Sequence, residues 1–302
     1  MENNLTEKDI EVLNKWAEAY DIKELKIKDK EKIFNLEELY ISEEYIPTEV
    51  FKLTNLKKLH IDYYRNTELP REICNLINLE ELSIECYNLK ELPKELGNLI
   101  NLEKLNIINC YNLTKLPKGI GNLTNLKSLH IRSNNLTKLP KEIFNLINLE
   151  ELHIISVSLT ELPKEIGNLT NLKSLHIRSN NLTKLPKEIF NLINLEELHI
   201  ISVSLTELPK EIGNLTNLKI LDICNNLKEL PKEIFNLINL EKLRIISNNL
   251  EISPDGIEKL INLENLYIDI NIINENFNFK SFPIEEIGKL NNLKEFDISI
   301  RK

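Results

Sequence analysis

Hydrophobic and polar residues recur along this chain in a unit of about 23 residues. In the unit that begins at Leu126, the apolar residues Leu129 and Ile131 alternate with polar ones, which is the pattern of a half-buried strand. After an asparagine turn, Pro140 fixes φ and lacks an amide hydrogen, which suits the start of a short helical turn. Ile143 then points inward. One unit therefore predicts a strand, a turn and a short helical or 3₁₀ segment.

The unit occurs about twelve times, and residues 120–173 are repeated without a change as residues 166–219. One unit cannot bury its own apolar stripe, so neighbouring units must stack to form a continuous core. We therefore predict an α/β solenoid. The leading leucines of the units are Leu36, Leu56, Leu79, Leu102, Leu126, Leu149, Leu172, Leu195, Leu218, Leu240, Leu263 and Leu293.

The motif LxxLxI, followed by N-x-L-x-x-L-P and x-E-I-x-N-L, resembles the leucine-rich repeat family, in its 23-residue bacterial and Ras-group type. The match extends over about residues 22–300. The resemblance implies a right-handed horseshoe with a parallel β-sheet on the concave face and short helical or 3₁₀ segments on the convex face. Since family members nearly all act by binding, it also implies a non-catalytic protein–protein interaction scaffold.

In this family an asparagine at the position of Asn134 forms a hydrogen-bond ladder between coils. Here that position becomes Val157 and Val203 in alternate repeats, so we expect the ladder to be interrupted. At the equivalent helix position, phenylalanine alternates with glycine, which we interpret as packing between adjacent coils. These residues are Phe144, Phe190 and Phe235, and Gly121, Gly167 and Gly213.

The chain ends are less regular than its middle. Residues 1–21 are expected to form an N-terminal helical cap, in which Thr6 and Asp9 can make a capping box. Residues 22–302 are expected to form the solenoid, with a shortened first strand at residues 22–27 and a last strand at residues 293–300.

The unit that begins at Leu263 carries an insertion between Asn271 and Phe282. Its aromatic residues can cap the last coil, which is the reading we favour, or form a functional loop.

Composition limits the class of partner and compartment. The formal net charge is −9, with 47 acidic and 38 basic residues, which argues against nucleic-acid or anionic-membrane binding. The acidic N-terminus has no signal-peptide pattern, and no apolar run approaches the ~20 residues of a membrane span. The four cysteines lack CxxC spacing. We expect a cytoplasmic monomer, with export by a non-classical route as the alternative.

Strand alternation assigns side chains to columns on the concave face. All five histidines of the chain fall in one column, and four are consecutive. The neighbouring column mixes isoleucine with arginine, which is typical of interface anchors. We predict that a protein partner binds here. The predicted contact residues are His130, Arg132, His153, Ile155, His176, Arg178, His199, Ile201, Asp222 and Arg244.

The histidine column leaves two alternatives open. Imidazoles on strands about 4.8 Å apart can share a transition metal, or their protonation can make the face pH-responsive. A flat ladder offers no tetrahedral pocket or outer shell of hydrogen bonds, and copying a two-repeat unit multiplies histidines without selection for a site. We therefore assign no metal and no cofactor, and keep self-association through the last strand as a third alternative.

Catalytic motifs are missing from the sequence. It contains no GxSxG, P-loop, HExxH or dinucleotide-binding glycine pattern. A nucleophile on an open sheet would also lack an oxyanion hole. We predict that the protein is not an enzyme and has no catalytic residues.

Overall fold

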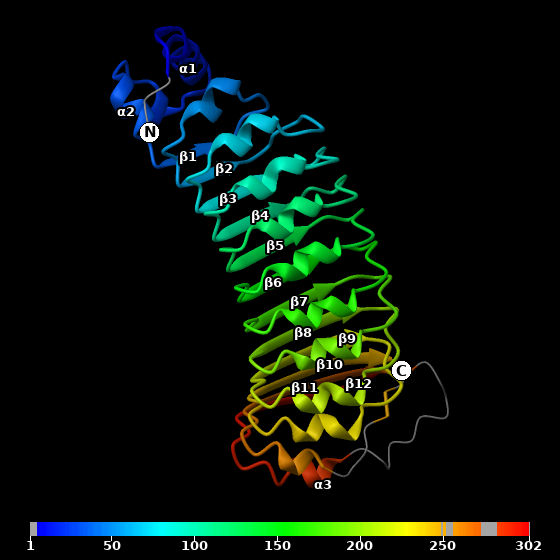
Figure 1. Ribbon diagram of the computed structural model, residues 1–302. Helices are drawn as coiled ribbons and strands as arrows, with labels where there is room; N and C mark the ends of the chain where they lie inside the picture. Colours follow the sequence, from blue (N-terminus) through cyan, green and yellow to red (C-terminus); the bar gives the residue numbers. More distant parts are fainter. Residues whose placement is uncertain (1–4, 249, 252–255, 273–282, 302) are drawn as a thin grey trace. The chain divides into compact units, whose positions relative to one another are not determined.

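The computed structural model describes residues 5–248, 250–251, 256–272 and 283–301. The chain forms two compact units, residues 1–149 and residues 150–302. In each unit, parallel strands line one side and short 3₁₀ turns line the other (Figure 1). The predicted insertion between Asn271 and Phe282 lies largely outside the described residues.

From residue 5 onward, the first unit begins with two helices and continues as five strands that pair in sequence order. The helices are α1 (Glu7–Tyr20) and α2 (Lys30–Phe34), with the turn η1 (Lys23–Leu25) between them. The strands are β1 (Glu38–Ile41), β2 (Lys58–Ile61), β3 (Glu81–Glu85), β4 (Lys104–Ile108) and β5 (Ser128–Arg132). The 3₁₀ turns are η2 (Thr48–Lys52), η3 (Arg71–Asn75), η4 (Lys94–Asn98), η5 (Lys118–Asn122) and η6 (Lys141–Asn145).

The described part of the second unit holds seven strands, again paired in sequence order. They are β6 (Glu151–Ile155), β7 (Ser174–Arg178), β8 (Glu197–Ser202), β9 (Ile220–Asn225), β10 (Lys242–Asn248), β11 (Asn265–Asn271) and β12 (Glu295–Arg301). The turns are η7 (Lys164–Asn168), η8 (Lys187–Asn191), η9 (Lys210–Asn214), η10 (Lys232–Asn236) and η11 (Ile257–Lys259), and helix α3 spans Ile284–Ile287.

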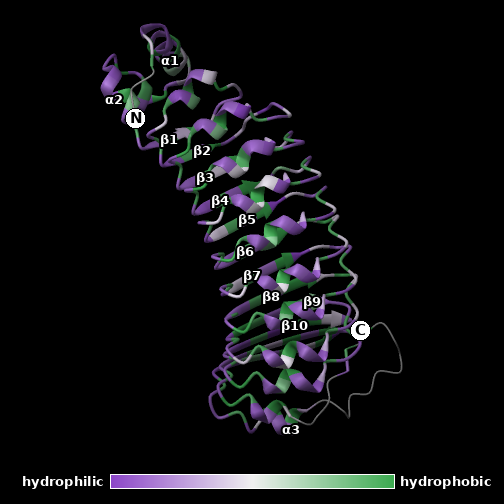
Figure 2. Ribbon diagram, in the orientation of Figure 1, coloured by the Kyte–Doolittle hydropathy of each residue, from purple (hydrophilic) through white to green (hydrophobic). Residues whose placement is uncertain are grey.

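Parallel pairing places equivalent residues of successive repeats beside one another. In the second unit, Leu152 pairs with Leu175 and Leu175 with Leu198, and all three are fully buried. Pro186, with φ −66°, precedes η8, as the sequence predicts for a fixed-φ residue at a turn start. Hydrophobic and hydrophilic residues alternate along strands and turns of both units (Figure 2). Within each unit, the predicted stacking of strands and short 3₁₀ turns around a continuous core is confirmed.

The expected strand at residues 22–27 is wrong. Lys23–Leu25 forms the 3₁₀ turn η1, and β1 begins only at Glu38. Leu25 is fully buried, and the Ile27 carbonyl accepts a hydrogen bond from the Asn14 side chain at 3.1 Å. The apolar residues of this segment therefore pack under helix α1 instead of joining the sheet.

The buried polar residue of several coils lies one position before the asparagine position that the family resemblance predicts. Asn134 is exposed, whereas Ser133 is fully buried and donates to the Leu113 carbonyl at 2.7 Å. The same bond recurs from Ser202 to Leu182 at 2.8 Å. The serine before Val203 therefore satisfies a backbone carbonyl of the preceding coil, where the valine side chain itself cannot form a hydrogen bond.

Glycine at alternate turns allows adjacent coils to approach closely. A methyl group at Gly167 would lie 2.7 Å from the Glu188 carbonyl oxygen of the next turn. Phe190 in that next turn is fully buried. The alternation of glycine and phenylalanine therefore combines a close backbone contact with a filled core in consecutive turns.

Substituting Gly167 with alanine is expected to destabilise the protein by about 1–3 kcal/mol, because the methyl group overlaps a backbone carbonyl. The matched control is Gly288→Ala, whose methyl group would lie at an ordinary 3.4 Å from the Glu285 carbonyl oxygen. Urea unfolding measures both variants. Equal losses for the two would contradict the proposed close approach.

Helix α1 is fixed to the first repeats by polar contacts as well as apolar ones. Thr6 and Asp9 form the predicted capping box, and the Lys52 ammonium lies 2.8 Å from the Asp9 carboxylate. Trp16 donates from Nε1 to the Tyr45 carbonyl at 3.1 Å. Burial alone would raise the pKa of Asp9, but its hydrogen bonds from Lys52 and Thr6 lower that pKa below its usual value.

Because the folded state lowers the Asp9 pKa, the ionised carboxylate stabilises the fold above its unfolded pKa and ceases to do so as pH falls through the folded value. Asp9→Asn should therefore cost about 1–2 kcal/mol at pH 7, with the difference shrinking as pH falls below about 4. Urea unfolding across this range measures it. Glu11→Gln, on the exposed side of α1, is the control and should change stability little. A pH-independent Asp9→Asn cost would contradict the assignment.

Candidate functional site

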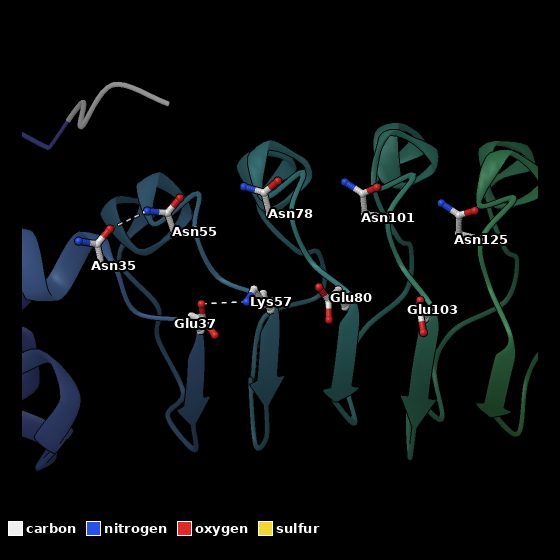
Figure 3. Close-up of a pocket in the computed structure, with 9 residues that line it drawn as sticks. All are labelled: Asn35, Glu37, Asn55, Lys57, Asn78, Glu80, Asn101, Glu103 and Asn125. Carbon is white, nitrogen blue, oxygen red and sulfur yellow. Dashed lines mark hydrogen bonds and ion pairs between the residues drawn. The ribbon is translucent and has the colours of Figure 1, made fainter.

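The first unit contains an open hollow of about 540 Å³ along the corner that precedes its strands. Figure 3 shows two rows of side chains there, one of asparagines and one of mainly acidic residues. The asparagines are Asn35, Asn55, Asn78, Asn101 and Asn125, and the second row is Glu37, Lys57, Glu80 and Glu103.

The asparagine row holds adjacent coils together. Asn78 donates from Nδ2 to the Thr54 carbonyl at 2.8 Å, and Asn101 donates to the Ile77 carbonyl at 2.9 Å. Equivalent bonds recur in the second unit, for example from Asn194 to the Thr170 carbonyl. These amides already have backbone partners, so the hollow in Figure 3 is best explained as part of the repeat framework.

The open face of the second unit carries a continuous row of interacting side chains, one from each of strands β6 to β11. The ring centroids of His153 and His176 lie 4.1 Å apart, and those of His176 and His199 lie 3.7 Å apart. His199 Nδ1 lies 3.6 Å from Asp222 Oδ2, and Arg244 Nη1 donates to Asp222 Oδ1 at 2.9 Å. The row is completed by Tyr267, whose ring centroid lies 5.3 Å from the Arg244 guanidinium.

Asp222 is the electrostatic centre of this row. Its side chain is only 17% exposed, so burial by itself would raise the pKa of the carboxyl. The contacts with His199 and Arg244 outweigh that burial and lower the Asp222 pKa below its usual range. A charged carboxylate is therefore held between an imidazole and a guanidinium.

A second row lies beside the first on the same face. Ile155 pairs with Arg178, and Arg178 pairs with Ile201 on the next strand. Arg178 is exposed and the two isoleucines are half-buried. The sheet therefore presents one cationic side chain between two apolar ones.

The structure distributes the predicted contact residues over both units. The second unit brings together the eight from His153 to Arg244 in these two rows. His130 and Arg132 lie on β5 of the first unit, where His130 is half-buried and its Nε2 lies 3.4 Å from Ser128 Oγ. Arg132 is exposed on the same face.

Some residues of the open face lie outside the predicted set of contact residues. Glu197 lies two residues before His199 and is half-buried beside it, and Tyr267 closes the row at Arg244. Asp269 is buried and receives a hydrogen bond from Arg301 Nε at 3.2 Å. Their columns were visible in the repeat alignment, but their contacts depend on side-chain rotamers that the alignment does not give.

Among the described residues, no helix combines the length and apolar composition needed to cross a membrane.

Comparisons with known proteins place this geometry among repeat proteins. A family model described as a leucine-rich repeat region matches residues 29–134, 117–206 and 201–302. No curated protein matches the chain. A solved leucine-rich repeat protein of Leptospira interrogans is 32% identical, with 89% of this chain and 79% of that one covered and a TM-score of 0.56.

Two further solved structures are similar to the chain. The leucine-rich repeat domain of the type III effector XopL is 32% identical, covers 64% of this chain and 70% of its own, and has a TM-score of 0.57. An internalin of Listeria monocytogenes is 18% identical, with 96% and 95% of the two chains covered and a TM-score of 0.51, which supports the fold alone.

Replacing Arg244 with methionine should raise the pKa of Asp222. Burial, which raises this pKa, is then opposed by His199 alone instead of by His199 and Arg244 together. Carboxyl-carbon NMR titration measures this shift. Arg132→Met, in the other unit, is the control and should leave Asp222 unchanged. An unaltered Asp222 pKa in Arg244→Met would contradict the assigned contact.

Proposed function

Because the chain belongs to the leucine-rich repeat family, we propose that it is a non-catalytic scaffold that binds a protein partner along the open face of its sheet. The resemblance to this family implies that this face is the concave side of the solenoid. The predicted contacts are the eight residues from His153 to Arg244 in the two rows of the second unit, together with His130 and Arg132 on the open face of the first.

The observation that carries this proposal is the Ile155–Arg178–Ile201 row in fixed register. Arginine and half-buried apolar side chains are frequent anchors in protein interfaces. Because each side chain stands on a paired strand, little backbone entropy is lost when a partner docks. A matching partner surface would place a carboxylate over Arg178, with apolar groups on either side.

The neighbouring row supports the same role. The contacts among His199, Asp222 and Arg244 hold these side chains in place before a partner arrives. Prearranged polar groups give specificity, because a partner that fails to complement them leaves charges desolvated. No bond-breaking step is required of any residue in this proposal.

Charge reversal at Arg178 tests the proposed face. In a pulldown from a lysate of the source cells, Arg178→Glu should retain at least tenfold less of the bound protein than the unaltered chain, because an interface anchor becomes a repelling charge. The matched control is Lys187→Glu, an equal charge change on an exposed residue of η8.

The melting temperature of both variants should stay close to that of the unaltered chain, which separates lost binding from lost folding. Retention that survives Arg178→Glu but fails in Lys187→Glu would move the binding surface to the turns and refute the proposal.

A further inference from the structure

A cluster of three metal-ligating side chains lies on the open face of the second unit. His176, Glu197 and His199 each offer one ligand atom, and these atoms all lie within 4.8 Å of one another. All three residues are half-buried. We propose that this cluster binds one divalent transition-metal ion of the zinc class.

The ligand set suits this class of ion. Two neutral imidazoles and one carboxylate form a common nitrogen–oxygen set for zinc, whereas Mg²⁺ and Ca²⁺ prefer oxygen ligands alone. Zinc bonds of 2.0–2.2 Å bring tetrahedral ligands to about 3.4 Å from one another. Closing the cluster around an ion therefore requires the ligand atoms to approach one another by about 1 Å and the two facing imidazole rings to rotate.

Strand register explains why the three residues converge. His176 pairs directly with His199 across β7 and β8, so their rings share one column. Glu197 lies two residues before His199 on β8, and therefore on the same face of the sheet. All three positions are set by the backbone of two adjacent paired strands, which is a firmer support than a loop.

Groups outside the cluster orient two of its ligands. Asp222 Oδ2 lies 3.6 Å from His199 Nδ1, so Nε2 is the ring nitrogen that would bind the ion, and Arg244 Nη1 donates to Asp222 Oδ1 at 2.9 Å. Ser174 Oγ donates to Glu197 Oε2 at 3.4 Å. A carboxylate behind a ligating histidine is the usual outer shell of a zinc site, and it was the feature that a flat histidine ladder was expected to lack.

Repeat duplication accounts for only part of this cluster. Residues 120–173 and 166–219 are identical, so copying alone supplies the histidines and Glu197. Asp222 lies beyond the copied segment, and it is the residue that completes the contact behind His199.

The cluster is also accessible. An open hollow of about 300 Å³ is lined by residues of β6, β7 and β8 and the corners before them, and it includes His176 and Glu197. A three-ligand site leaves a further coordination position, which water can occupy through this opening.

Isothermal titration of zinc chloride into the full-length, chelator-treated chain tests the proposal without any protein partner, so its outcome is independent of the proposed scaffold role. One saturable site per chain is expected. His199→Ala and Glu197→Gln should each weaken it by at least 100-fold, and Asp222→Asn by about 10- to 100-fold.

Two controls exclude other ligands. His60→Ala, at a histidine in the first unit, and Cys224→Ser, at the half-buried thiol one strand beyond His199, should both leave zinc affinity unchanged. Circular dichroism without metal should show the same fold in every variant. Absence of saturable binding, or equal binding by the unaltered chain and His199→Ala, would overturn the proposal.

Discussion

Within each unit, every strand is held against the next with equivalent residues side by side, and this parallel register is the constraint on which the rest of the structure depends. It aligns Leu152, Leu175 and Leu198 into one buried column. It equally aligns His153, His176 and His199 into one half-buried row on the open face. Core and surface are therefore ordered by the same backbone pairing, and a short repeat is enough to specify both.

Backbone polar groups at the corners are satisfied by side chains that repeat with the same period. At the end of β8, Ser202 donates a hydrogen bond to the Leu182 carbonyl of the preceding coil. At the corner before β8, Asn194 donates to the Thr170 carbonyl of the preceding coil. Because these bonds link consecutive coils, they stabilise the stacking more than they stabilise any single repeat. The asparagine column of the first unit lines the hollow in Figure 3.

Much of the fold could be predicted from sequence, because alternation within a strand and the 23-residue period are properties of residue order alone. The alignment of side chains into columns follows for the same reason, as with Arg178 between Ile155 and Ile201. The 3₁₀ turn at Lys23–Leu25 could not be predicted. The apolar residues of segment 22–27 have a spacing that fits either a short strand or packing under a helix. The Asp222–His199 contact could not be predicted either, because it depends on rotamers.

We propose that the open face of the second unit is the surface that binds a protein partner. The most direct measurement is hydroxyl-radical footprinting of the chain with and without the protein that it retains from a lysate. Protection should concentrate on Ile155, Arg178 and Ile201, while residues of the 3₁₀ turns such as Lys187 react equally in both samples. Protection on the turns, with the open face still fully reactive, would contradict the account.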